Sequence, residues 1–235
     1  MTTLHAKPST LRPPDRVTRR LLGCGAIGAP LFVIVFLVEG AVRQDYRPLR
    51  DQVSGLAIGQ RGWVQIANFI ICGVLMLALA VGLRRALRPG TVAVVAPVLA
   101  GLYALGLIAS GVFVTDPRDG YPPTSPSGQA AAHTWHGDAH NVAGTVVFLA
   151  LPVLCFVVAA WFTRRSRQWL WAAYSVATGV AMLALIQGLA VEDHGGLYQR
   201  LTIVAGWGWL TALALHLRRR ATTAPAEVLA HLPGT

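Results

Sequence analysis

Residues 141–163 read NVAGTVVFLALPVLCFVVAAWFT, a continuous stretch without a single charged residue. A helix needs about 20 predominantly apolar residues to cross a hydrocarbon layer roughly 30 Å thick. Similar runs recur along the chain, and we expect transmembrane helices at 20–42, 62–84, 92–115, 140–163, 168–190 and 198–217. The sequence therefore predicts an all-α integral membrane protein with a bundle of about six transmembrane helices.

The composition of the chain agrees with this fold class. Of its 235 residues, 54% are hydrophobic and only 13% are charged, whereas soluble domains carry about 25% charged residues. We expect a tail at 1–19, one transmembrane domain at 20–217 and a basic tail at 218–235. The three cysteines, Cys24, Cys72 and Cys155, fall inside apolar runs, so they are predicted to be buried thiols rather than a disulfide framework.

The chain has a net charge of +10, and its basic residues are distributed unevenly along the sequence. Fourteen of the 20 lie at the amino-terminal tail, in two short turns and at the carboxyl-terminal tail: Lys7, Arg12, Arg16, Arg19, Arg20, Arg84, Arg85, Arg88, Arg164, Arg165, Arg167 and Arg218 to Arg220. Cytoplasmic loops of membrane proteins are rich in Lys and Arg. We therefore expect both termini in the cytoplasm, and we exclude nucleic acid as a partner because no folded basic face remains.

Polar residues inside the predicted helices gather toward the outer side. They are Glu39, Gln65, Asn68, Ser110, Asp116, His140, Asn141, Gln187, Glu192, Asp193, His194, Gln199 and Arg200. Polar groups facing lipid are costly, so they tend to face a bundle interior or a wet cavity. The pattern predicts a polar cavity that opens outward and is closed toward the cytoplasm. The inner halves lack the polar lining that a channel or transporter needs. An irregular membrane interface is the alternative.

Histidines cluster before the fourth predicted helix, at His133, His136 and His140. His136 and His140 are four residues apart and share one face of a helix. That spacing matches the histidine pair of metalloprotease helices, although Gly137 stands where those helices have a glutamate. The pair is a candidate zinc site. The alternative is a hydrated loop whose histidines hydrogen-bond locally.

A third zinc ligand would have to come from another helix end on the same side. The candidates are Asp116 and His194. Asp138 or Glu192 can then orient an imidazole or act as a base.

The first outer loop, residues 43–54, contains three arginines and two acids. Arg47 and Arg50 are three residues apart and can grip a phosphate or carboxylate, or they can form exposed ion pairs, which we favour for Arg43. Ser54 has no nucleophile motif around it. The connection at 116–128 is rich in Pro, Ser and Gly and is a candidate lid or a flexible link.

Several of these segments resemble a bacterial family of six-span membrane proteins, the domain of unknown function numbered 998. The resembling segments are Val53 to Ala57, Gly111 to Phe113 leading to Asp116, His136 with His140, and Gly196 to Leu201 with Trp209 beyond. The family pattern has an acid before the last arginine of this set, and Gln199 departs from it. The resemblance covers about residues 20–220. It implies the six-span architecture and a bacterial plasma membrane, and it implies no reaction.

These observations leave three classes of function open. The first is a protein whose outer cavity binds a lipid headgroup or another small polar ligand, in support of the cell envelope. The second is an outward-facing zinc-dependent hydrolase of a lipid ester or amide, with zinc held by His136, His140 and either Asp116 or His194. The third is an accessory subunit of a membrane complex, either with a partner subunit or as a homo-oligomer. The candidate ligand-binding residues are Arg47, Arg50, Ser54, Asp116, Glu192 and Arg200.

Overall fold

The protein is an all-helical bundle throughout the part of the chain that its structure, a computed structural model, describes. The described residues are 15–118, 120–123, 125, 133–191 and 193–220. The six long helices are α1 (Arg16–Val42), α2 (Gly62–Ala86), α3 (Val92–Val112), α4 (Trp135–Trp161), α5 (Trp169–Ile186) and α6 (Gly195–Arg219). Three short elements join them: the 3₁₀ turns η1 (Val53–Ala57) and η3 (Gln187–Ala190), and the π turn η2 (Phe162–Ser166).

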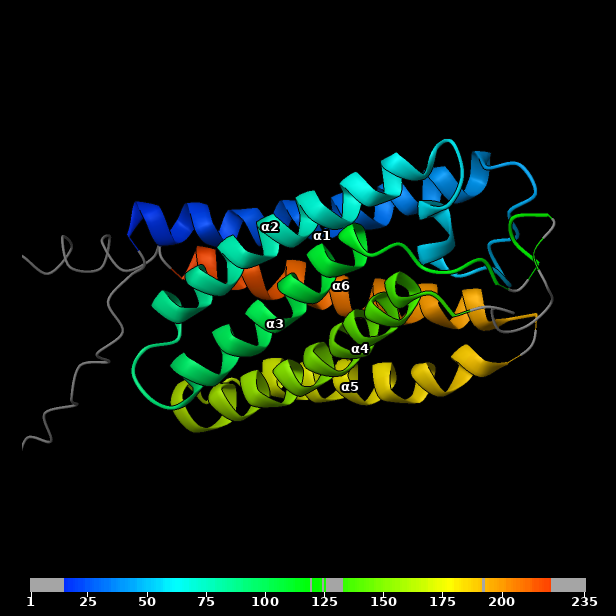
Figure 1. The fold of residues 1–235 in the computed structure, drawn as a ribbon. Helices are drawn as coiled ribbons and strands as arrows, with labels where there is room; N and C mark the ends of the chain where they lie inside the picture. The colour runs from blue at the N-terminus through cyan, green and yellow to red at the C-terminus, as the bar shows by residue number, and fades with distance from the viewer. Residues whose placement is uncertain (1–14, 119, 124, 126–132, 192, 221–235) are drawn as a thin grey trace, which may run out of the picture.

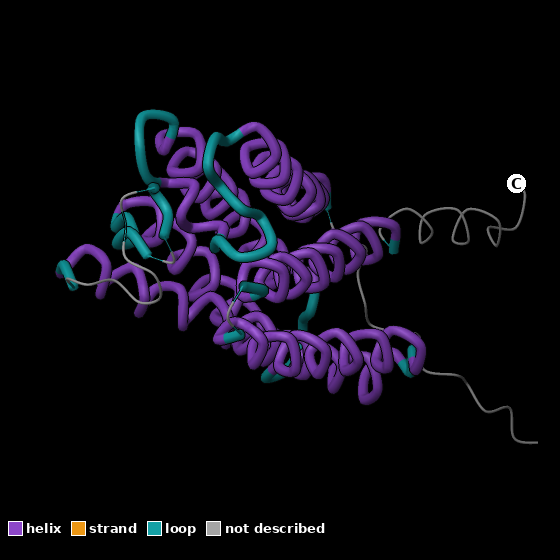
Figure 2. The backbone as a smooth tube through the Cα atoms, turned by 90° about the vertical axis from the view of Figure 1, so that its right-hand side faces the viewer, coloured by secondary structure: helices purple, strands orange, loops and turns teal. Residues whose placement is uncertain are grey.

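The six helices run alongside one another (Figure 1), and their contacts close them into a ring. Each helix packs against the next one in the chain, and α6 packs against both α5 and α1. The short connections α2–α3 and α4–α5 lie at one end of the bundle, together with the start of α1 and the end of α6. The three longer connections lie at the other end, which faces the viewer in Figure 2.

Helices α1 and α4 begin several residues before the predicted spans, because polar caps lie upstream of the apolar runs. Helix α1 begins at Arg16, where the Asp15 carboxylate accepts a hydrogen bond from the Thr18 amide at 2.7 Å. Helix α4 begins at Trp135 rather than at 140. The Thr134 hydroxyl accepts from the Gly137 amide at 3.0 Å, which satisfies one of the amides left free at a helix start.

The other predicted bounds differ mainly at the end that carries the long connections. Helix α3 ends at Val112 and α5 at Ile186, before the expected 115 and 190, while α6 begins at Gly195 rather than at 198. Helix α2 matches its predicted start at Gly62. The apolar runs are thus correct, but a hydrophobic stretch continues into 3₁₀ and irregular backbone where the chain turns.

Five helices, α1 to α5, are long and apolar enough to cross a membrane. Helix α6 has 25 residues, a length of about 37 Å at 1.5 Å per residue, but it is less apolar. Its buried face carries Gln199, Arg200 and Thr202 near its start. Since this helix packs between α1 and α5, its polar groups meet protein rather than lipid. The chain is an integral membrane protein, and its sixth span remains a prediction.

One end of the bundle gathers the basic residues and is called the basic end below; the opposite end is called the loop end. Arginines 84, 85, 88, 164, 165, 167, 218, 219 and 220 lie at or next to the helix termini of the basic end. There Arg85 bonds the Asp15 carboxylate at 2.6 Å and the Thr18 hydroxyl at 2.8 Å. The expected asymmetry is therefore present in space. Its cytoplasmic assignment remains a prediction. Of the expected tails at 1–19 and 218–235, residues 1–14 and 221–235 lie outside the described residues.

The interior nearest the basic end is tightly packed. Its largest fully buried side chains include Trp209, Phe162, Leu79 and Leu83. The Trp209 indole donates to the Ser175 hydroxyl at 3.0 Å, which joins α6 to α5. Helix contacts here are close, so the free space of the bundle lies toward the loop end.

Candidate functional site

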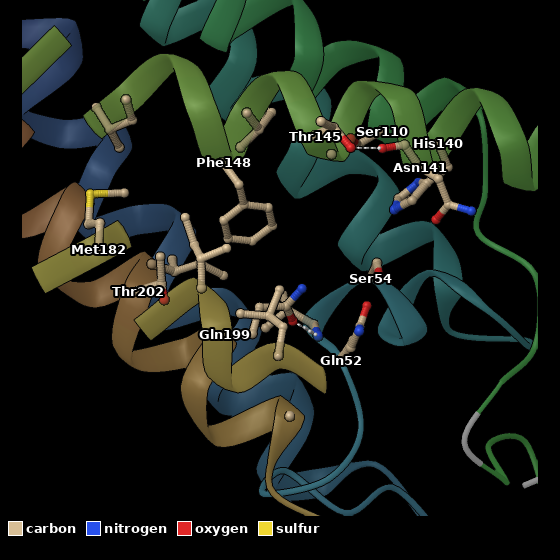
Figure 3. Close-up of a pocket in the computed structure, with 18 of the residues that line it drawn as sticks. Gln52, Ser54, Ser110, His140, Asn141, Thr145, Phe148, Met182, Gln199 and Thr202 are labelled. Carbon is tan, nitrogen blue, oxygen red and sulfur yellow. Dashed lines mark hydrogen bonds between the residues drawn. The ribbon is translucent and has the colours of Figure 1, made fainter. Parts of the chain in front are cut away.

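A cavity of about 790 Å³ lies between the helices, in the half of the bundle nearer the loop end (Figure 3). Helices α3, α4, α5 and α6 and the turn η1 supply most of its walls. Phe32 of α1, Phe69 of α2, the turn η3 and residues of the loops at the loop end also line it. The volume falls in the range of roughly 300–1,000 Å³ that is usual for small-molecule sites. This space is the candidate site.

The part of the cavity nearest the loop end has a polar lining. Its members are Arg50, Gln52, Ser54, Ser110, Arg118, His140, Asn141, Thr145, Asp193 and Gln199. Figure 3 shows Gln52, Ser54 and Gln199 on one side of the space, with His140, Asn141 and Ser110 across from them. Most of these groups carry hydrogen-bond donors.

The deeper part of the cavity has an apolar lining. Its members include Phe32, Phe69, Leu107, Phe148, Leu151, Met182, Ile203 and Trp207. The rings of Phe32 and Trp207 stack with centroids 4.5 Å apart and an interplanar angle of 2°. The space is therefore polar at one end and apolar at the other, and the expectation of a polar cavity did not include this apolar part.

The mouth of the cavity opens sideways between α4 and the end of α5. Lining residues that are also exposed mark this opening. They are Asn141, Thr145 and Leu149 on α4, Ala190 and Val191 at the end of η3, and Asp193 just before α6. Both helices are candidate membrane spans, so the opening lies where a surrounding bilayer would be.

The turn η1 is held in place by α6. The Gln199 side-chain oxygen accepts a hydrogen bond from the Val53 amide at 2.7 Å. This bond fixes the neighbouring Ser54, which is buried and lines the cavity. It also turns the Gln199 amide nitrogen, a donor of two hydrogen bonds, toward the polar lining.

Arg200 joins the first loop to α6 rather than lining the cavity. Its guanidinium donates to the Asp51 carbonyl at 2.9 Å, to the Gly196 carbonyl at 3.0 Å and to the Tyr46 hydroxyl. The Tyr46 hydroxyl in turn donates toward the carbonyls of Asp51 and Gln52. Burial raises the pKa of Tyr46 to about 12, which keeps the phenol neutral. The structure thus gives Arg200 an architectural position.

Arg43 was expected in an exposed ion pair; it does form an ion pair, but the pair is buried and its partner is Glu39. Its guanidinium is buried and bonds Glu39 at 3.0 Å. It also donates to the carbonyls of Leu56 and Ile58, both at 3.0 Å. Glu39 bonds Arg61 as well, at 2.6 Å. Glu39 thus contributes to a cluster that ties the first loop to α1, and it does not line the cavity.

Arg47 and Arg50 have separate environments. Arg47 is exposed and does not belong to the cavity lining. Arg50 lines the cavity and bonds the buried Asp51 carboxylate through Nε at 2.9 Å. The two arginines therefore do not form the shared phosphate or carboxylate site that their spacing allows.

A family model described as "Protein of unknown function (DUF998)" matches residues 26–216. The chain belongs to the DUF998 family. A search of curated proteins and a search of solved structures each found no similar protein. Membership assigns this DUF998 protein no activity.

Asp116 of this DUF998 protein holds the start of α4. Its two carboxylate oxygens accept from the Thr134 hydroxyl at 2.6 Å and from the Thr134 amide at 3.0 Å. These hydrogen bonds keep the pKa of Asp116 below its ordinary value of 3.8. A Cβ on residue 137 would overlap the Asp116 carboxylate, which explains why glycine follows His136.

The histidines of this family member have different environments and different contact partners. His140 is buried, lines the cavity and donates from Nδ1 to the Phe113 carbonyl at 2.8 Å. His136 is exposed and its ring lies against Trp135, with centroids 3.8 Å apart. His133 lies 3.5 Å from the Asp138 carboxylate, with both side chains exposed. His194 is exposed at the start of α6.

The predicted zinc ligands are not brought together in the part of the chain that the structure describes. Among those residues no group of three His, Cys, Asp or Glu side chains is placed to hold a metal ion. Asp116 uses both oxygens on Thr134, and Glu192 lies outside the described residues. The zinc site remains a sequence prediction without a geometric counterpart. The expected lid at 116–128 also lies partly outside the described residues.

The apolar half of the DUF998 cavity was not predicted from the sequence. Phe148, Met182, Ile203 and Trp207 are ordinary residues of an apolar helix, and no local signal distinguishes a cavity wall from a packed core. Gly144 is a weak signal, because a Cβ there would meet nothing within 4 Å. Conversely, Gln65, Asn68 and Gln187 were expected in the cavity and do not line it.

Proposed function

We propose that the protein binds a membrane amphiphile, with its polar head at the loop end of the cavity and its apolar chain between α4, α5 and α6. The observation that carries this proposal is the change in lining along one cavity, from donors such as Gln199 and Ser54 to rings such as Phe148 and Trp207. A small polar metabolite would leave the apolar half unfilled, and a hydrocarbon would leave the polar half unpaired.

The position of the mouth supports a membrane lipid as the ligand. Because the opening lies between two candidate spans, a lipid can reach the cavity from the bilayer without passing through water. The positive-inside rule places the basic end in the cytoplasm, so the lipid would come from the outer leaflet. In a bacterium this site faces the cell envelope.

A variant that fills the cavity tests this proposal. Gly144 lines the cavity and has open space beside its Cα, so Gly144→Phe places a ring inside it. Gly208→Phe is the matched control, because Gly208 also has open space and lies outside the cavity lining. Lipid bound to the detergent-purified proteins is counted by native mass spectrometry.

We expect about one lipid per chain in the wild type and in Gly208→Phe, and at least a fivefold loss in Gly144→Phe. Equal lipid retention in both variants, or no retained lipid in the wild type, would remove the proposal. Similar melting temperatures of the two variants show that the loss is local to the cavity.

A second candidate is hydrolysis of an ester lipid in the same cavity. The observation that favours it is His140, whose Nδ1 is fixed on the Phe113 carbonyl and whose other ring nitrogen is therefore the basic one. Such a nitrogen can take a proton from water. Release of fatty acid from oleoyl-glycerol by the wild type, lost in His140→Gln, would support hydrolysis. Elemental analysis of the same samples separates a zinc-assisted reaction from a metal-free one.

A further inference from the structure

We infer that the head of the bound amphiphile is a phosphate, held between Arg50 of the first loop and Arg118 of the loop after α3. This inference rests on the proposed binding function and narrows it to one class of lipid. Both arginines line the polar end of the cavity, and they approach it from segments that are far apart in the sequence.

Arg50 is held in an orientation in which its terminal guanidinium nitrogens can donate hydrogen bonds to a ligand. Its Nε is bonded to Asp51 at 2.9 Å, and its terminal nitrogens lie beside Gly120, 3.4 and 3.6 Å from where a Cβ would be. Within the described residues neither terminal nitrogen makes a hydrogen bond. A guanidinium fixed through Nε presents its remaining donors as a fork that fits two phosphate oxygens.

Neutral donors extend the site around the two arginines. The Gln199 oxygen is occupied by the Val53 amide, so its nitrogen is free to donate into the cavity. The Ser54 hydroxyl is buried and lines the same region, and Gln52 lies beside it in Figure 3. A head with several strong acceptor oxygens satisfies this set of donors. A phosphate has three such oxygens, and a carboxylate has two.

Positive charge near the polar end also favours an anion. Among the described lining residues the charged side chains are Arg50, Arg118 and Asp193, of which Arg50 is paired through Nε with the buried Asp51 carboxylate and Asp193 is exposed. Arg200 lies buried behind the first loop, and among the described residues no carboxylate forms an ion pair with it. Positive charge in a partly closed space of low dielectric attracts an anion more strongly than it would in water.

The chain of the lipid cannot supply this selectivity. An acyl chain leaves one apolar environment, the bilayer, for another, the lining around Phe148 and Trp207. The transfer therefore gains little from the hydrophobic effect, which depends on removing apolar surface from water. Discrimination among lipids must come from the head, where charged hydrogen bonds form.

Three lipids that share one tail test the inference: oleoyl-glycerol phosphate, oleoyl-glycerol and oleate. Binding to the full-length protein in detergent is measured by displacement of a fluorescent fatty-acid probe from the cavity. We expect the phosphate lipid to bind at least about tenfold more tightly than the other two, about 1.4 kcal/mol in free energy. Inorganic phosphate alone should not displace the probe.

Substitutions of Arg50 and Arg118 test whether these side chains cause the preference for the phosphate lipid. Arg50→Gln and Arg118→Gln should each lower the affinity for the phosphate lipid about tenfold and leave that for oleoyl-glycerol unchanged. Arg50→Lys should retain part of the preference, because the charge stays and the fork is lost. Arg47→Gln is the matched control on the same loop and should change nothing, since Arg47 is exposed and outside the lining.

The outcomes separate this inference from the proposed function. Equal binding of all three lipids, or a preference that survives both glutamine variants, would overturn the phosphate head while the amphiphile cavity stands. Oleate binding as tightly as the phosphate lipid would also overturn it. Displacement by inorganic phosphate alone would indicate a soluble ligand instead. Binding of none of the lipids would remove the proposed function itself.

Discussion

At the scale of single residues, the buried polar groups of the loop end serve mainly to position backbone. Arg43, Arg200 and Asp116 each bond a carbonyl or an amide of another segment. Backbone that leaves a helix near a membrane must find internal partners. These side chains supply those hydrogen-bond partners, and other polar side chains of the loop end face the cavity.

Tyr46→Phe tests the role of the Arg200 contacts. The variant removes the hydroxyl that accepts from Arg200 and donates toward Asp51 and Gln52, and it leaves a buried guanidinium nitrogen without its partner. We expect a loss of about 1–3 kcal/mol of stability, measured by thermal unfolding in detergent. Tyr174→Phe, at an exposed position of α5, is the control. Equal stability of the two variants would contradict the assigned role.

Asp116 gives a pH-dependent contribution to stability. Because its folded pKa lies below 3.8, the stabilisation is fully present above that value and is lost as the pH falls through the folded pKa. Asp116→Asn lacks it. The stability difference between wild type and variant should be on the order of 1 kcal/mol at pH 7 and should be lost as the pH falls through the folded pKa of Asp116. A difference that grows on acidification would contradict this assignment.

At the scale of elements, close helix contacts depend on individual glycines. A Cβ on Gly73 of α2 would lie 2.6 Å from Ile108 and 3.0 Å from the Ala104 carbonyl of α3, whereas one on Gly101 would meet nothing within 4 Å. Both glycines lie within apolar helices, so the sequence does not tell them apart.

Gly73→Val should therefore destabilise the bundle, and Gly101→Val should not. Overpacking of a tight contact costs about 1–3 kcal/mol, which would appear as a lower melting temperature in detergent. The loss of helix propensity is the same in both variants, so their difference isolates the contact. Similar melting temperatures would show that α2 and α3 can separate without cost.

At the scale of elements, the candidate site could be predicted from the sequence only in part. His140 and Gln199 were correctly expected on the polar side of the bundle, because hydropathy locates a residue along a helix. The zinc set of His136, His140 and a third helix found no counterpart in the described residues. Spacing along one helix says nothing about what lies across from it, and Asp116 turned out to bond Thr134.

At the scale of the whole molecule, the two ends of the bundle differ in chemistry. The basic end is tightly packed and carries the clustered arginines, and the loop end carries the cavity. This polarity fits a protein that faces the outside with its site and the cytoplasm with its termini.

Cysteine labelling of intact cells tests this orientation. Gln60→Cys lies exposed at the loop end and Thr91→Cys exposed at the basic end, in a chain whose partly exposed Cys24 is replaced by alanine. A membrane-impermeant maleimide should label the cysteine at 60 in intact cells and the cysteine at 91 only after lysis. The reverse pattern would place the cavity in the cytoplasmic leaflet.

The sequence by itself determined the helical membrane architecture, the approximate spans and the segregation of basic residues, because hydropathy and charge are properties of local segments. Only the tertiary structure decided which polar groups face a cavity, which bind backbone, and that half of the cavity is apolar. The physical reason is that the environment of a side chain depends on the segments opposite it. In this ring of helices those segments come from distant parts of the chain, as Gln199 with Val53 and Arg200 with Tyr46 show.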